Sequence, residues 1–279
     1  MRRALIALVP MVACGAPEGT ASPRAKTADE ATANLPQDPG LPGVTVAPVT
    51  PSMSADEAAA ALSIALGRPP DSTETTAAYR MLMAQGDEYC PGNEYYITDI
   101  HLYGCDSSTG YHFAGISDWL EEEVDAGLNA WLEGVAGDFW IVTPDGELFE
   151  AGGHSVYISG DTFWMRELAG SWLWQGGDPW IASGFSGSLI IEEEYARGIR
   201  MSGGAQIQGV SWSATELMLP AGCDYGPVGR LGLRDPGGGW YTMVFEDCEP
   251  CATVMFEETD LGEACVDFAP FLSAMEAMR

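Results

Sequence analysis

The stretch Phe139-Trp140-Ile141-Val142-Thr143-Pro144-Asp145-Gly146 decides the fold class of this 279-residue chain. Its first five residues are aromatic or β-branched, as in strands. Pro-Asp-Gly is a turn sequence, because proline presets its own φ and glycine accepts a positive φ. Asp235-Pro236-Gly237 repeats the turn ahead of another such run at 240–246. The pattern predicts antiparallel strands joined by tight turns.

Short apolar or alternating runs of the same kind extend from about residue 90 to 268, with glycines between them. We interpret the glycines, including Gly-Gly pairs, as breaks between strands. The expected fold class is mainly β: a large antiparallel β-sheet domain over 89–279 with disulfide-stapled hairpins. Residues 117–133 fit either a strand or a helix, and 271–278 fit a short terminal helix. The expected runs are 95–103, 111–119, 139–143, 156–168, 180–192, 206–219, 231–234 and 240–246.

Two short helices are expected before the sheet, over 53–88. Ser54-Ala55-Asp56-Glu57 is a capping box, in which the serine hydroxyl bonds an amide of the first turn and the glutamate reaches back. The helix that follows ends at Gly67 and two prolines. Asp71-Ser72-Thr73-Glu74 repeats the start signal, and Gly86 ends the second helix. Its expected buried face is Ala78, Met81, Leu82 and Gln85.

The N-terminus has the layout of an export signal. Met1-Arg2-Arg3 is positive, residues 4–13 are mainly apolar, and the run ends in Met11-Val12-Ala13-Cys14-Gly15. A small residue followed by cysteine at this place resembles the lipobox of bacterial lipoproteins. The resemblance implies that a signal peptide, 1–13, is removed and that Cys14 carries the lipid.

The residues that follow Cys14 indicate the membrane in which the lipid is anchored and a tether between the lipid and the folded domain. Gly15 in place of aspartate favours the outer membrane, by resemblance to enterobacterial sorting. Residues 14–52 are rich in Pro, Thr and Ala, and are expected to form a disordered tether. The alternative is an ordinary secretory signal that is cut nearby and leaves Cys14 as a free thiol.

The chain has seven cysteines, so assigning Cys14 to the lipid leaves six. In an exported chain, six cysteines favour disulfides over metal sites. Sequence alone does not fix their connectivity in general, but residues that face each other in a hairpin lie equally far from its turn. Two pairs are each centred on polar, turn-rich sequence, and a third requires a chain reversal near Ile97. The predicted bonds, in that order, are Cys251–Cys265, Cys223–Cys248 and Cys90–Cys105.

Scattered motifs over 88–265 carry a family resemblance. They are Cys90-Pro91, Gly104-Cys105, Gly110-x-x-Phe113-x-Gly115, Gly222-Cys223, Leu231-Gly232-Leu233-Arg234-Asp235-Pro236 and Gly239-Trp240-Tyr241-Thr242-Met243-Val244-Phe245. These motifs are similar to those of exported lipoproteins of unknown function from myxobacteria. The resemblance implies a large antiparallel β-sheet protein and brings no catalytic residues with it.

The net charge of the chain argues against a general nucleic-acid-binding function. Against 12 Lys and Arg stand 41 Asp and Glu, a net charge of -29. A general nucleic-acid binder must neutralise rows of phosphates, which this composition does not support. Strong catalytic and nucleotide-binding motifs are missing from the sequence, so we expect neither catalytic residues nor a cofactor.

Cys248-Glu249-Pro250-Cys251 is the sharpest chemical motif. It resembles the dithiol of thioredoxin-like oxidoreductases, and with Cys223 and Cys265 it has the spacing of a four-cysteine zinc site. The sequence after it is β-like, and only a short segment follows. We therefore favour structural disulfides at these cysteines.

Other candidate groups each have a competing structural interpretation. Histidines can serve as bases or ligands, acidic clusters can bind Ca²⁺, and dense tryptophans can stack a sugar. For each group we favour the structural interpretation, in which the histidines are partly exposed strand residues, the acidic clusters form a solvated face, the tryptophans pack in the core and the serine is a plain strand residue. The candidates are His101, His112 and His154; residues 121–123, 192–194 and 257–258; Trp164, Trp172, Trp174 and Trp180; and the incomplete nucleophile elbow at 184–188.

The sequence thus predicts a lipid-anchored envelope or surface lipoprotein with a non-catalytic binding or structural role. The expected partners are a membrane, through the N-terminal lipid, and divalent cations or carbohydrate, with no nucleic acid. An extracytoplasmic enzyme acting on carbohydrate is the alternative. A thiol-disulfide oxidoreductase using Cys248 and Cys251 is a further, minor one.

Overall fold

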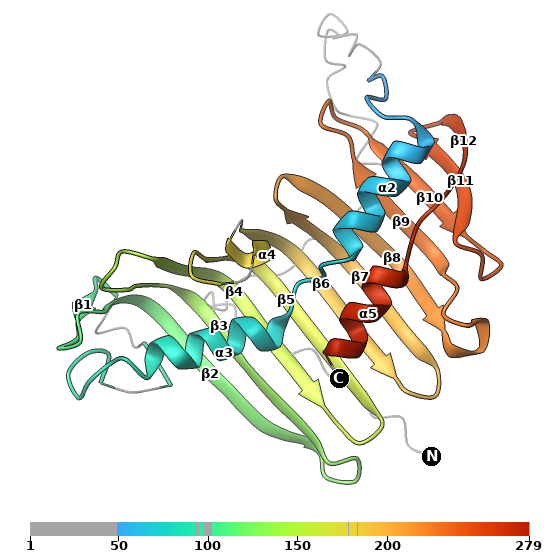
Figure 1. The fold of residues 1–279 in the computed structure, drawn as a ribbon. Helices are drawn as coiled ribbons and strands as arrows, with labels where there is room; N and C mark the ends of the chain where they lie inside the picture. The colour runs from blue at the N-terminus through green and yellow to red at the C-terminus, as the bar shows by residue number, and fades with distance from the viewer. Residues whose placement is uncertain (1–48, 93–94, 98–101, 178, 183, 279) are drawn as a thin grey trace, which may run out of the picture. The chain divides into compact units, whose positions relative to one another are not determined.

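The computed structural model describes residues 49–92, 95–97, 102–177, 179–182 and 184–278, and its fold is shown in Figure 1. Twelve antiparallel strands form one sheet in which every strand pairs with the next one along the chain. Two helices precede the sheet, so the mainly β fold class is confirmed. The expected signal peptide, Cys14 and the tether up to residue 48 lie outside the described residues. No helix among the described residues is long and apolar enough to cross a membrane.

The strands differ greatly in length, and the longest are near the start of the sheet. They are β1 Cys105–Asp106, β2 His112–Asp125, β3 Ala130–Val142, β4 Leu148–Ser159, β5 Phe163–Trp174, β6 Phe185–Glu194, β7 Gly198–Ile207, β8 Val210–Pro220, β9 Val228–Arg234, β10 Trp240–Phe245, β11 Cys251–Phe256 and β12 Thr259–Cys265. The helices are α2 Ala55–Leu66, α3 Ser72–Met83, α4 Pro179–Ala182 and α5 Ala269–Ala277, with a 3₁₀ turn, η2, at Ala221–Cys223.

Many glycines lie inside strands, so the prediction that they separate strands is wrong. The expected run 139–143 is only the end of β3, and Gly152-Gly153 lies in the middle of β4. Residues 117–133 form strand, turn and strand across the β2–β3 hairpin. Two further expected runs, 156–168 and 206–219, each contain a hairpin turn between strands. The sheet therefore has longer strands than the sequence indicates.

A row of four glycines crosses the long strands. Gly137, Gly153, Gly170 and Gly187 are each paired with the next, from β3 to β6. A Cβ on any of the four would lie 2.0 to 2.2 Å from a carbonyl oxygen of the adjacent strand. Glycine kinks of this kind bend strands and let backbones approach closely. We call this set the glycine row.

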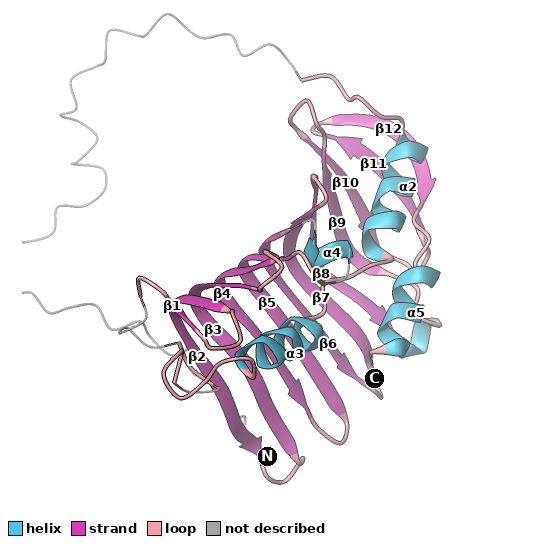
Figure 2. Cartoon of the chain, turned by 60° about the vertical axis from the view of Figure 1, so that its left-hand side comes forward, coloured by secondary structure: helices cyan, strands magenta, loops and turns pink. Residues whose placement is uncertain are grey.

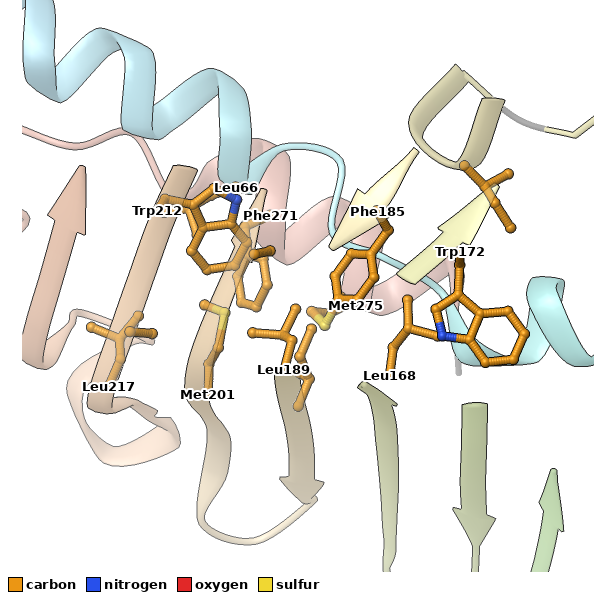
Figure 3. Packing of buried hydrophobic residues seen from close by; sticks show 14 of the residues in the cluster. Leu66, Leu168, Trp172, Phe185, Leu189, Met201, Trp212, Leu217, Phe271 and Met275 are labelled. Carbon is orange, nitrogen blue, oxygen red and sulfur yellow. The ribbon is translucent and has the colours of Figure 1, made fainter. Parts of the chain in front are cut away.

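The face that contains the glycine row, here called the inner face, carries the large apolar side chains. Strand alternation places Trp172 and Phe185 on it, and both are fully buried. Figure 2 shows α2, α3 and α5 lying over this face. In Figure 3, Phe271 and Met275 of α5 are packed against side chains of the central strands. The opposite, outer face is left uncovered by the described helices.

The two helices ahead of the sheet begin where the sequence predicts. The Ser54 amide donates to Glu57 at 2.8 Å, and the Glu57 amide donates to the Ser54 hydroxyl at 3.3 Å, which completes the capping box. Asp71 caps α3 by accepting from the Thr73 amide at 2.8 Å. The expected face of α3 is partly wrong, because Met81 is 53% exposed. The residues that α3 buries are Ser72, Thr75, Thr76, Ala78, Tyr79, Leu82 and Met83.

Buried polar groups fasten this helical layer to the sheet. Arg166 of β5 bonds Asp71 and the Thr73 hydroxyl at the start of α3, and it donates to the Met278 carbonyl after α5 at 2.5 Å. One guanidinium thus holds the start of α3 and the residue after α5 to one strand. Its planar fork of donors suits such branched contacts.

Asp235 fastens the segment ahead of α2 to the β9–β10 turn. Its carboxylate accepts from the Ser52 amide at 2.9 Å, from the Ser52 hydroxyl at 2.6 Å and from the Tyr241 hydroxyl at 2.5 Å. Burial opposes the charge, but these hydrogen bonds outweigh it and hold the pKa of Asp235 well below its usual range. The Asp-Pro-Gly sequence is therefore both a turn and an anchor.

The glycine row leads to a first prediction. Gly170→Ala should lower the free energy of unfolding by about 2–4 kcal/mol, because the added Cβ would lie 2.0 Å from the Gly152 carbonyl oxygen. Gly146→Ala is the matched control: its φ of 85° is close to the 99° of Gly170, but a Cβ there meets nothing within 4 Å. Denaturant unfolding measures both variants. Equal losses would contradict a special role for the row.

A second prediction concerns Asp235 and pH. The pKa of Asp235 is lower in the folded state, so its stabilisation is present above the unfolded value of about 4 and is lost as pH falls. Asp235→Asn should therefore lower the free energy of unfolding by about 1–3 kcal/mol at pH 7. The difference in unfolding free energy between the variant and wild type should shrink below pH ~4. Asp145→Asn, at an exposed position in the Pro144-Asp145-Gly146 turn, is the control. If Asp235→Asn lowers the free energy of unfolding by the same amount at every pH, the proposed role of the Asp235 carboxylate is wrong.

Candidate functional site

The six cysteines within the described residues all form disulfides. The bonds are Cys90–Cys105, Cys223–Cys248 and Cys251–Cys265, the three pairs that the hairpin argument predicts. Cys251 and Cys265 face each other across β11 and β12. Because Cys248 and Cys251 belong to different bonds, the Cys-Glu-Pro-Cys motif holds neither a redox dithiol nor thiolate zinc ligands. The oxidoreductase and zinc interpretations of this motif are wrong.

The described histidines lie apart from each other. His112 Nδ1 is 2.9 Å from Asp106 Oδ1 near β1, and His154 Nε2 is 2.9 Å from Glu167 Oε1 on the outer face of β4 and β5. The hydrogen bond between His154 and Glu167 raises the pKa of the histidine and lowers that of the glutamate. His101 lies outside the described residues. Two separate His–carboxylate pairs on a sheet surface do not form a catalytic group.

Strand alternation disperses the acidic clusters. In residues 192–194, Glu192 and Glu194 point to the outer face, where they pair with Arg200 and Arg197 at 3.0 Å. Glu193 points inward and accepts from the Trp164 indole at 2.8 Å. Among the residues that the structure describes, no group of three His, Cys, Asp or Glu side chains can hold a metal ion.

The tryptophan cluster belongs to the core. Trp164, Trp172 and Trp174 are 6%, 0% and 6% exposed on the inner face, which confirms the core interpretation and excludes them as an open sugar platform. The side chain of Trp180 is outside the described part. Gly184 precedes β6 and residues 185–188 lie within it, so they do not form the strand-to-helix turn of a nucleophile elbow.

A polar hollow of about 580 Å³ lies between α3 and strands β3 and β4, and it is the place where carboxylates converge. Glu133 accepts from Arg80 at 2.9 Å and from the Tyr157 hydroxyl, while Asp71 accepts from Arg166. Burial and the hydrogen bond to Glu133 raise the pKa of Tyr157 to about 12. These carboxylates are held by cations, so the cluster fastens α3 to the sheet and does not poise a group for proton transfer.

The outer face has an uneven distribution of charge. Most of its carboxylates lie on β2 to β6, two more, Asp260 and Glu263, lie on β12 at the far edge, and its arginines lie on β7 and β9, as the strand register shows. The acidic half holds Asp118, Glu122, Asp138, Glu150, Glu167, Glu192 and Glu194, and the basic half holds Arg200, Arg230 and Arg234 with Glu216. Few cations exist in this chain, so three on one patch of sheet are a distinct feature.

A β-bulge in β8 hollows the sheet beside these arginines. Thr215 and Glu216 together stand opposite a single residue of β7, and the register shifts again on the β9 side. Glu216 has a left-handed φ of 49°, and a Cβ on Gly229 would lie 2.4 Å from its carbonyl oxygen. Bulges re-aim side chains and often border functional sites. The hollow of about 690 Å³ is lined by Arg200, Ser202, Thr215, Glu216, Met218, Val228, Gly229, Arg230 and Val244.

A tryptophan lies next to this hollow. Carbons of the Trp240 ring would be 3.2 and 3.5 Å from a Cβ on Gly232, so the ring lies over that buried glycine and next to the Ser213 hydroxyl. The Trp240 amide donates to Glu257 at 2.9 Å, which fixes the start of β10. Trp240 is 38% exposed. We call Arg230, Arg234, Trp240 and the hollow the basic patch.

The basic patch can bind an anion, and sequence reasoning missed it. The signal was present in Arg230-Leu231-Gly232-Leu233-Arg234, where arginines alternate with leucines that are buried inside. Period-two alternation puts both arginines on the same open face. The sequence does not show which strands lie next to β9, or that β8 contains a bulge.

Comparisons with known protein families, with curated proteins and with solved structures found no match to this chain.

The disulfides give a third prediction. Peptide mapping without reduction should recover the three bonds and no Cys248–Cys251 bond. The double variant Cys251→Ser with Cys265→Ser should lose about 2–4 kcal/mol of stability, since it removes a cross-link that closes a loop of 14 residues. A Cys248–Cys251 bond that a mild dithiol reagent opens without unfolding would restore the oxidoreductase hypothesis.

Proposed function

We propose that this protein is an exported lipoprotein of the cell envelope, anchored to the outer membrane by lipid on Cys14, and that its β domain binds a ligand without catalysis. The N-terminal sequence, the even number of remaining cysteines and the resemblance to exported myxobacterial lipoproteins support the anchored location. Three disulfides fit an oxidising compartment outside the cytoplasm.

The single observation that carries the binding role is the open outer face of the sheet. The inner face is filled by helices and large side chains, whereas the outer face presents a hollow, two arginines without an ion pair among the described residues, and an exposed tryptophan. Concave surfaces with a few convergent polar groups are typical of ligand sites.

The pairing of the carboxylates favours a binding role over a carbohydrate-active enzyme. Two carboxylates of the hollow under α3, Asp71 and Glu133, are paired with arginines. A glycosidase needs two carboxyl groups aimed at one bond, one of them able to give up a proton. The basic patch, for its part, offers binding groups and a single carboxylate in its hollow, Glu216.

The anchor is tested by the fourth prediction. Intact mass of the membrane-fraction protein should show a mature chain that begins at Cys14 and carries a diacylglycerol group. Cys14→Ser should shift the protein from the membrane to the soluble fraction, because the lipid would no longer be attached. Ala13→Gly, which keeps a small residue before the cysteine, is the control. A soluble wild-type protein that begins at another residue would contradict the proposed anchor.

A further inference from the structure

We propose that the basic patch binds an acidic saccharide, a sugar that carries carboxylate groups. The inference deepens the proposed function, and it rests on the binding role of the open outer face. It identifies the ligand class from three features of the patch: arginines without an ion pair among the described residues, an aromatic ring that lies over Gly232, and a hollow that mixes hydroxyl and apolar groups.

The arginines supply the charge that the ligand must match. Arg230 and Arg234 are exposed on the outer face of β9 and make no ion pair with any described residue. Arg200 is paired with Glu192 at 3.0 Å, in an exposed contact that a ligand anion can replace. Because salt screens exposed charges beyond about 8 Å, these nearby cations outweigh the acidic half of the sheet for a ligand bound here.

The spacing of the two free arginines indicates a ligand larger than a single anion. They are four residues apart on one strand, which places them about 13 Å apart along β9. The Trp240 ring lies over Gly232, midway between them on the same face. A pyranose ring placed over this indole would stack its C–H face on the aromatic surface and direct charged groups toward either arginine.

The hollow next to Arg230 fits the remainder of such a ligand. Ser202 and Thr215 offer hydroxyl groups that can exchange hydrogen bonds with sugar hydroxyls, and Met218, Val228 and Val244 offer apolar contact. A volume of about 690 Å³ exceeds what a lone phosphate or carboxylate fills. Glu216 at the edge of the hollow accepts hydrogen bonds from hydroxyls and disfavours a second anion there.

Single-stranded nucleic acid shares some of this chemistry, since it also stacks on aromatic rings and pairs with arginines. The patch offers only three cations in a chain with a net charge of -29, and nucleic-acid binding requires a basic groove that follows the backbone. The three disulfides also fit an oxidising compartment outside the cytoplasm, where a chain this acidic has few cations to offer a polyanion such as nucleic acid. The observations thus favour the saccharide.

The fifth prediction uses trigalacturonic acid as the probe and the full chain as the protein. Calorimetric titration should detect binding that weakens as salt is added, and the fully methyl-esterified probe should bind at least about tenfold more weakly, because it cannot form charge-assisted hydrogen bonds. Arg230→Gln with Arg234→Gln should weaken binding by about tenfold or more. The matched control, Arg68→Gln with Arg197→Gln, makes the same change of net charge away from the patch and should bind as wild type.

A second pair of variants tests the aromatic contact. Trp240→Ala should weaken binding by at least about fivefold. Trp140→Ala removes a ring that is equally exposed, at 39%, on the outer face of β3, and should leave the affinity unchanged. Near-ultraviolet circular dichroism of each variant verifies that the fold is retained.

The outcomes separate this inference from the proposed function. If trigalacturonate does not bind, or if the Arg230/Arg234 variant binds it as well as wild type, the acidic-saccharide site is wrong, while the lipid anchor is judged by its own experiment. If oligothymidylate binds more tightly and displaces the probe, the ligand class is wrong. If the probe binds and is cleaved, the saccharide class is supported and the non-catalytic role is contradicted.

Discussion

The close approach of backbones at the glycine row is the constraint on which the rest of the structure depends. At Gly137, Gly153, Gly170 and Gly187, the space for a side chain is taken by the carbonyl oxygen of the neighbouring strand. A continuous wall of side chains would keep the long strands straighter. The row lets the backbones of β3 to β6 approach each other closely on the inner face, onto which the helices pack.

The two faces of the sheet then have different physical roles. The inner face is closed by α2, α3 and α5, which are capped by Ser54 and Asp71 and fastened by Arg166 and Asp235. Arg166 is held there by an ion pair with Asp71, and Asp235 by hydrogen bonds from Ser52 and Tyr241, so these groups hold the layers together. The outer face has no helical cover among the described residues, and its charges are sorted into an acidic half and the basic patch. Stability and ligand binding thus use opposite sides of one sheet.

Sequence rules succeeded where the deciding interaction was local. The capping box at Ser54, the turn at Asp235 and the cysteine pairs centred on turns each depend on residues that are close along the chain, so spacing was informative. Glycines failed as guides, because Gly153 in a strand and Gly146 in a turn have the same identity and both have a positive φ. Only the register of neighbouring strands distinguishes them. The basic patch was missed for the same reason, since it joins residues from β7 to β10.

The most direct test of a binding site on the outer face is to locate the ligand on the protein. Met218 lines the hollow of the basic patch, whereas Met81 is exposed on α3, on the opposite side of the sheet. Dilute peroxide converts accessible methionine to the sulfoxide, and mass spectrometry follows each residue separately. With trigalacturonate present, oxidation of Met218 should slow while that of Met81 stays constant. Protection of Met81, or no change at Met218 under conditions in which the ligand is bound, would contradict a binding site on the outer face.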